Sequence, residues 1–146
     1  MFEIVSCIAD IATVLAVVVA VYQLRIDLTR KRRVSTLEAY DILQREAFDT
    51  LNKWSPKEIK EACENRQSDA YKDLSAALAR IEYFCVGINH KVYDIDIFYD
   101  ISHGYFDEGG ALYRRMMPIL ESKLSTAKED YFKNIHKVLA EMKAKS

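Results

Sequence analysis

The sequence predicts an all-α protein in which a single N-terminal transmembrane helix precedes a cytoplasmic bundle of helices. Residues 4–24 form an apolar run that contains one charged side chain. After this run, apolar residues recur three and four positions apart, which is the spacing of one helical face. The chain has only four glycines and two prolines among 146 residues, too few for the many turns of a β-sandwich or barrel.

The composition narrows the class of protein before any motif is considered. Half of the residues are hydrophobic and 29% are charged, which excludes a wholly disordered chain. The net charge of −1 gives no overall positive field of the kind that attracts nucleic acid. Basic residues nevertheless concentrate in residues 25–33, so we expect an anchor with a basic flank at 1–33 and a helical bundle at 34–146.

The apolar run has the length and charge layout of a membrane anchor. A helix of this length, at about 1.5 Å per residue, crosses the roughly 30 Å hydrocarbon core of a bilayer. A cleaved signal peptide carries its positive charge before the apolar region, and a core helix of a soluble protein shows polar positions at helical spacing; the run fits neither. Because the basic residues follow the run, the positive-inside rule places the bundle in the cytoplasm.

Asp10 is the one charge inside the run, and two interpretations of it remain open. In the first, its carboxylate reaches back to the outer interface. In the second, several anchors pack together and direct Asp10 toward a shared axis, which predicts a homo-oligomer and a pore. Small side chains allow helices to approach closely, and the run carries several at helical spacing: Ala9, Ala12, Ala16 and Ala20.

The basic flank is expected to face anionic lipid, where each positive charge contributes about 1 kcal/mol. No aromatic residue lies among these charges, so stacking platforms for nucleic acid are absent, and we do not expect the flank to bind nucleic acid by itself. Its members are Arg25, Arg30, Lys31, Arg32 and Arg33.

Two arrangements are open for the segment after the flank. Ser35 and Glu38 match a capping box with Val34 as its hydrophobic staple, which predicts a new helix there. Alternatively, the anchor continues as one long helix, because neither glycine nor proline interrupts residues 2–55. In both cases one apolar face is expected to pack inward: Leu37, Tyr40, Leu43, Ala47, Phe48, Leu51 and Trp54.

Two further helices follow. Ser55, Pro56 and Glu58 form a capping box with proline at the first helical position, which predicts a short helix that ends near Asn65. Residues 70–89 are then expected to form a helix that is buried nearly all round at its end. Its apolar positions are Tyr71, Leu74, Leu78, Ile81, Phe84, Cys85, Val86 and Ile88.

The last third of the chain predicts three more helices. Asp94 caps a helix that ends near Ser102, with Ile97, Phe98 and Ile101 facing inward, and Gly104 terminates it. A helix at 111–124 contains Pro118, which predicts a kink or the true start of the helix. Thr126 and Glu129 form another capping box before the final helix, whose apolar positions are Tyr131, Phe132, Ile135, Val138, Leu139 and Met142.

Residues 90–103 hold the densest set of polar side chains. Asp96, Asp100 and His103 share one helical face, where carboxylates and imidazoles can bind a divalent cation or act as acid and base. The simpler interpretation, which we favour, is a solvated face. The sequence contains no nucleotide-binding, zinc-protease or serine-hydrolase motif, so we expect no metal and no cofactor.

The candidates for catalysis are Arg80, His90 and Asp94. Some helical RNases pair Arg and His through an R-x(4–6)-H motif, but His90 lies too far beyond Arg80 for that motif. The alternative for Arg80 is an ion pair or a carbonyl contact in the bundle, and Cys85 is expected to be a core residue. The lack of a convincing active-site motif favours a protein that is not an enzyme.

The segment ARIEYFCVGINHKVYDIDIFYDISHG, together with the anchor, the basic flank and the proline-containing helix, resembles a widespread family of small bacterial and prophage single-pass membrane proteins with a domain of unknown function. Its most specific part runs from Glu82 to His90, followed by Asp94 and Tyr99. The resemblance implies the bacterial inner membrane and assigns no catalytic residue.

The plan of the chain is also similar to that of small transmembrane accessory proteins found beside RNA-targeting CRISPR nucleases. That similarity implies a helical domain distantly like the HEPN fold and assembly into membrane pores. We therefore expect a self-assembling, non-enzymatic pore-forming or membrane-perturbing protein of antiviral defence. The alternatives are a membrane-tethered HEPN-like RNase and a scaffold that docks a cytoplasmic protein partner.

Overall fold

The computed structural model describes residues 2–124 and 131–145, with side chains described at 11–123 and 131–145. Helices account for the architecture, and no strand occurs in these residues, as predicted. The elements are α1 (Phe2–Leu43), a π-helical segment (Gln44–Phe48), α2 (Asp49–Asn52), α3 (Pro56–Glu64), α4 (Asp69–Asn89), α5 (Ile95–Ser102), α6 (Ala111–Leu124) and α7 (Lys133–Lys143). The capping box expected at Thr126 and Glu129 lies outside the described residues.

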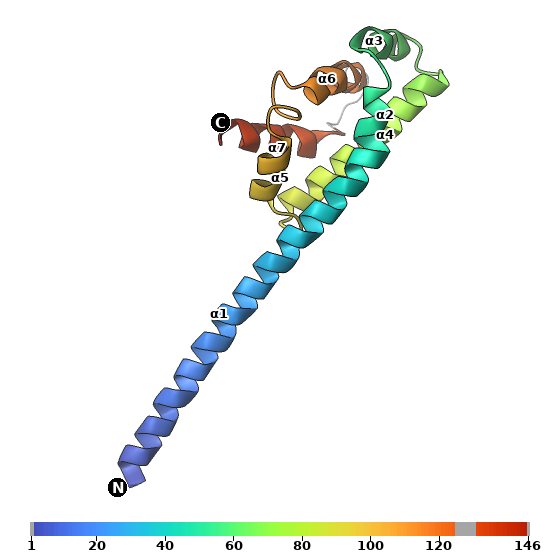
Figure 1. Ribbon diagram of the computed structural model, residues 1–146. Coiled ribbons are helices and arrows are strands. Elements are labelled where there is room, and N and C mark those ends of the chain that lie inside the picture. The colour runs from blue at the N-terminus through green and yellow to red at the C-terminus, as the bar shows by residue number, and fades with distance from the viewer. Residues whose placement is uncertain (1, 125–130, 146) are drawn as a thin grey trace.

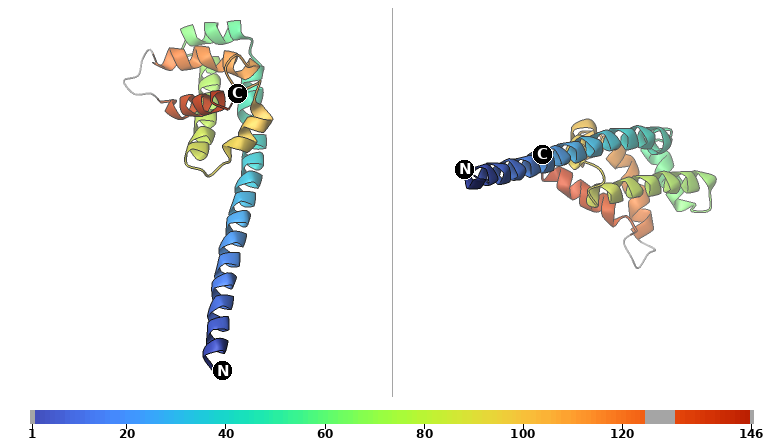
Figure 2. Two further views of the ribbon diagram at one scale, coloured as in Figure 1. Left: turned by 90° about the vertical axis from the view of Figure 1, so that its left-hand side faces the viewer. Right: turned by 90° about the horizontal axis from the view of Figure 1, so that it is seen from below.

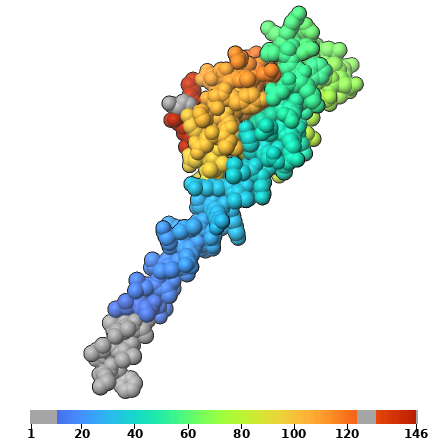
Figure 3. Space-filling model, viewed as in Figure 1, coloured from blue at the N-terminus to red at the C-terminus, as the bar shows by residue number. Residues whose placement is uncertain are grey.

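One unbroken helical rod runs from Phe2 to Asn52 and carries the bundle on its C-terminal part (Figure 1). The N-terminal part of α1 projects away from the bundle in all three ribbon views (Figures 1 and 2) and stands alone in the space-filling view (Figure 3). The single long helix is thus confirmed, and the helix start predicted at Ser35 is wrong. Ser35 and Glu38 are exposed residues in the interior of α1, where every N–H already has a helical partner to bond.

The bundle packs onto α4, which runs back beside the rod toward the anchor (Figure 1). α4 contacts α7, α3, α6 and the rod. Its buried positions are the predicted ones except Val86, which is only half-buried, and Ala77 joins them. The prediction that the end of this helix is buried nearly all round is wrong, because Tyr83 is 77% exposed and Glu82 and Gly87 are half-buried. The capping box at Ser55 and Glu58, the cap at Asp94 and the glycine terminator at Gly104, with φ +78°, are all confirmed.

The inward face of the rod differs from the prediction at one position. Leu37 is 48% exposed, whereas the adjacent Thr36 is fully buried against α5. Neighbouring helical positions are about 100° apart, so a face centred on Thr36 and Leu43 turns Leu37 to solvent. The π-helical segment at 44–48 contains about one residue more than an α-helical turn. This extra residue keeps Ala47, Phe48 and Leu51 on the buried side of the rod.

Two further predictions are corrected in the second half of the bundle. Ile101 is 38% exposed, because Phe98 and Ser102 provide the inward positions of α5. Pro118 lies inside α6 and is not its start, since α6 already begins at Ala111. An aromatic cluster joins the rod, α4 and α5 at the centre of the bundle: Phe48, Phe84, Phe98 and Phe106, with Tyr40, Tyr93 and Tyr105 at its edge.

Candidate functional site

The three catalytic candidates do not converge on one centre. Arg80 Nη1 donates to the backbone oxygen of Glu46 at 3.1 Å and lies 3.5 Å from the Glu46 carboxylate. This is the ion pair and carbonyl contact considered as the alternative, although both side chains are about half exposed. His90 is the exposed C-cap of α4, ten positions and about 15 Å of helix beyond Arg80.

Asp94, the third candidate, is 3% exposed and joins the bundle to the rod. Its carboxylate caps α5 by accepting the N–H of Asp96 at 3.0 Å. The same carboxylate lies 3.5 Å from Arg32 Nη2 and 3.7 Å from Arg33 Nε. Two arginines of the basic flank, which was expected to face lipid, therefore lie against the bundle. We call the contact of Asp94 with Arg32, Arg33 and Thr36 the junction.

The polar face of α5 is solvated. Asp96, Asp100 and His103 are exposed. Asp96 forms an ion pair with Lys145, and that hydrogen bond and charge lower the pKa of the Asp96 carboxyl. The His103 ring stacks on Tyr99, with centroids 5.1 Å apart. Among the described residues, no three His, Cys, Asp or Glu side chains gather closely enough to hold a metal ion.

The distinctive segment between Glu82 and Asn89 binds the start of α7. The Glu82 carboxylate accepts the N–H groups of Asn134 at 3.2 Å and of Ile135 at 2.9 Å, both in the first turn of α7. The Asn134 amide also donates to Glu82 at 2.6 Å, and the Asn89 amide donates to Asn134 at 2.8 Å. A carboxylate at a helix N-terminus satisfies donors that the helix itself leaves free. These residues therefore have structural roles.

Gly87 and Cys85 in the same segment are also explained by packing. The Tyr93 ring lies so close to Gly87 that an added Cβ would be 2.4 Å from it, and the same ring stacks on Phe84 at 4.9 Å. Cys85 is fully buried, as predicted for a core residue, and desolvation raises the pKa of its thiol well above 9.0. The Cys85 thiol is therefore not presented to solvent as a nucleophile.

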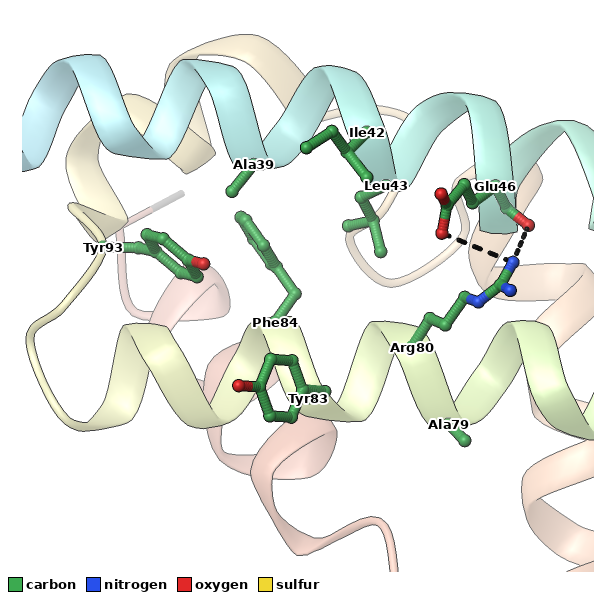
Figure 4. A pocket seen from close by; sticks show the side chains of 9 residues that line it. All are labelled: Ala39, Ile42, Leu43, Glu46, Ala79, Arg80, Tyr83, Phe84 and Tyr93. Atoms are coloured by element: carbon green, nitrogen blue, oxygen red, sulfur yellow. Dashed lines mark hydrogen bonds and ion pairs between the residues drawn. The ribbon is translucent and has the colours of Figure 1, made fainter.

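A groove of about 370 Å³ between α1 and α4 is the feature that sequence reasoning missed (Figure 4). Its walls are mainly apolar, and the Arg80–Glu46 pair closes one end. Tyr83 and Ile42 at its rim are 77% and 51% exposed. The lining residues are Ala39, Ile42, Leu43, Glu46, Ala79, Arg80, Tyr83, Phe84 and Tyr93. The sequence signal for the groove is the small side chain of Ala39 among larger apolar residues. This signal can be interpreted only once the pairing of α1 with α4 is known.

The projecting part of α1 is long and apolar enough to cross a membrane, and its most apolar 18-residue window is not buried by any part of the bundle. Ala12, Ala16 and Ala20 are exposed along it. The side chains of Ala9 and Asp10 lie outside the described residues. Three basic residues are exposed just beyond the end of the apolar stretch that is nearer the bundle: Arg25, Arg30 and Lys31.

Comparison with known proteins identifies a family without assigning a function. Neither the curated proteins nor the solved structures contain a match to the chain. The model of one family matches residues 10–142, which covers most of the anchor and the whole of the bundle core. The chain therefore belongs to the family described as a domain of unknown function, DUF4760.

Proposed function

We propose that the protein is a membrane-anchored, self-assembling, non-enzymatic protein, and that copies of the chain associate through the groove between α1 and α4. The observation that carries this proposal is the unbroken rod, which joins an unburied apolar anchor to one wall of an apolar groove. Because a helix rises about 1.5 Å per residue, a rod inserted in the membrane holds its groove at a fixed height above the bilayer.

A second copy is the occupant that this geometry favours. Copies in one membrane share one orientation, so their segments at residues 39–46 lie at the same height. Association of the anchors would bring these segments side by side, and the exposed side chains of Ile42 and Tyr83 would then be covered. Burial of such apolar rims contributes about 25 cal/mol per Å².

Assembly would also bring Asp10 of several copies to one level in the membrane, and this is how the protein would perturb the bilayer. A ring of carboxylates in packed anchors admits water and cations, whereas one carboxylate in lipid is costly. The proposal extends to a role in antiviral defence of the CRISPR type. The support for this extension is the similar plan of the chain alone. A tethered RNase has less support, because Arg80 is engaged with Glu46 and far from His90.

The first test is the mass of the full-length protein in mild detergent, measured by native mass spectrometry. We expect a discrete oligomer, and we expect Ile42→Glu to shift it to smaller species because a charge enters the apolar groove. Glu38→Gln, an exposed change on the same rod, is the control. A monomer in every detergent would contradict self-assembly and favour docking of another cytoplasmic protein.

The membrane effect has its own test. Expression of the protein should depolarise cells, and Asp10→Asn and Asp10→Leu should abolish the effect while leaving the oligomer intact. If both variants still depolarise cells as the unmodified protein does, the pore mechanism is wrong, whereas the proposed assembly is unaffected.

A further inference from the structure

A second hollow, of about 380 Å³, lies where the turn between α4 and α5 meets the rod on the side of the anchor. Figure 1 shows this turn beside α1 at the end of the bundle from which the projecting helix emerges. We call this hollow the notch. It is lined by Leu28, Thr29, Lys31, Arg32, Ser35, Lys91 and Val92.

The notch combines positive charge, hydroxyl groups and apolar surface. Lys31 and Lys91 are exposed, and no carboxylate among the described residues pairs with either. Arg32 pairs with Asp94 through Nη2, and 38% of its side chain remains exposed. Donors therefore exceed acceptors here, which favours an anionic ligand.

The backbone holds Lys91 at this position. Lys91 has φ 59°, a left-handed conformation that a lysine rarely adopts. The N–H groups of Val92 and Tyr93 both donate to the carbonyl of Gly87, at 2.9 and 3.1 Å, and fix the turn in this form. The turn directs residues 91 and 92 toward the rod, where they line the notch together with Lys31.

This inference rests on the membrane insertion proposed above, which places the lower end of the notch in the headgroup layer of a bilayer. The apolar run ends at Leu24, so Leu28 stands about 6 Å and Ser35 about 16 Å beyond the hydrocarbon edge. The headgroup layer occupies about 5–8 Å on each side. Side chains of a helix tilt toward its N-terminus, so Lys31 and Arg32 reach back toward the membrane from the upper part of the notch.

We propose that the notch binds the phosphate of an anionic phospholipid headgroup, with Lys31, Arg32 and Lys91 around the phosphate. Leu28 and Val92, which are 58% and 57% exposed, then contact the apolar part of the same lipid. These two side chains are the reason to assign a lipid and not a free phosphate ion. The site differs from a diffuse attraction of the basic flank, because Lys91 comes from the bundle, outside that flank.

The test is lipid binding to the full-length protein in detergent, followed by native mass spectrometry during titration with phosphatidylglycerol and, separately, phosphatidylcholine. We expect phosphatidylglycerol to bind more tightly. Lys91→Gln should weaken its binding about fivefold, since one positive charge near an anionic lipid is worth about 1 kcal/mol. Arg30→Gln removes the same charge from the flank, away from the notch, and should change the affinity less.

Lys91→Gly removes the amine while easing the backbone of the turn, so it separates loss of binding from loss of folding. It should weaken lipid binding as Lys91→Gln does, with an unchanged or higher melting temperature. Three results would overturn the proposal: equal losses in Lys91→Gln and Arg30→Gln, equal binding of both lipids, or release of the lipid by millimolar inorganic phosphate, which would indicate a free-anion site.

Discussion

The hydroxyl of Thr36 accepts the backbone N–H of Asp94 at 2.7 Å and donates to the carbonyl of Arg32 at 2.7 Å. This one buried side chain hydrogen-bonds the rod to the start of α5. The Asp94 carboxylate faces Arg32 and Arg33 from the same place. Tilting of the rod relative to the bundle would therefore break the buried hydrogen bond between Asp94 and Thr36, and the junction couples α1 to the helices of the bundle.

Thr36→Val should destabilise the bundle by about 1–3 kcal/mol, because the buried N–H of Asp94 loses its acceptor while the volume hardly changes. The measurement is urea unfolding of the full-length protein in detergent, followed by circular dichroism. Thr29→Val removes a similar bond, from the Thr29 hydroxyl to the carbonyl of Arg25 at 2.9 Å, on the exposed rod. That control should have little effect, and equal losses in the two variants would contradict a special role for the junction.

Glu82→Ala should loosen α7, because two N–H groups in the first turn of that helix lose their acceptor. We expect a loss of about 1–3 kcal/mol in the free energy of unfolding and faster hydrogen exchange confined mainly to α7. Glu61→Ala is the control, since the ion pair of Glu61 with Lys57 in the described part of the chain is exposed. Unchanged exchange in α7 would show that Glu82 does not hold the helix.

Gly87→Ala should destabilise the protein by about 1–3 kcal/mol through overpacking, because the added methyl group overlaps the Tyr93 ring. The ring cannot simply turn away, since it stacks on Phe84. A double-mutant cycle with Tyr93→Ala isolates the clash. The double variant should be more stable than the sum of the single losses implies, and strict additivity would exclude the clash as the cause.

Local signals in the sequence were sufficient for most of the helices. Ser55, Glu58 and Asp94 cap helices through atoms within a few residues, so short patterns predict them. The same reasoning failed at Ser35 and Glu38, because a capping box describes what a helix start requires and not whether the preceding helix stops. The absence of glycine and proline through residue 55 was the stronger signal there.

The candidate sites depend on contacts between distant segments, and a single sequence does not report those. The local sequence around Asp94 shows only an acid in a polar run, whereas its partners Arg32 and Thr36 lie about sixty positions earlier. The notch and the groove likewise form only when α4 returns beside the rod. The sequence predicts one lipid-facing basic flank, since nothing local distinguishes Arg32 and Arg33 from Arg30.

The cysteine thiols test the packing around α4. Burial raises the pKa of the Cys85 thiol well above 9.0, and burial also raises the pKa of Cys63, whose thiol donates to the Pro118 carbonyl at 3.7 Å. At pH 8 both thiols stay protonated in the folded state and react slowly. In a Cys7→Ser background, we expect slow labelling of Cys63 by a maleimide and almost none of Cys85 until urea unfolds the bundle.

The same pKa shifts fix the sign of the pH dependence. Unfolded thiols ionise near pH 9.0, before the folded ones do, so the unfolded state releases protons first as the pH rises. The contribution of Cys85 to stability is thus complete below pH 9.0 and is lost above it. Cys85→Ala should reduce this alkaline loss in urea titrations between pH 8 and pH 10, at the cost of a small cavity. Rapid labelling of Cys85 in the folded protein would contradict the burial of its thiol in the core of the bundle.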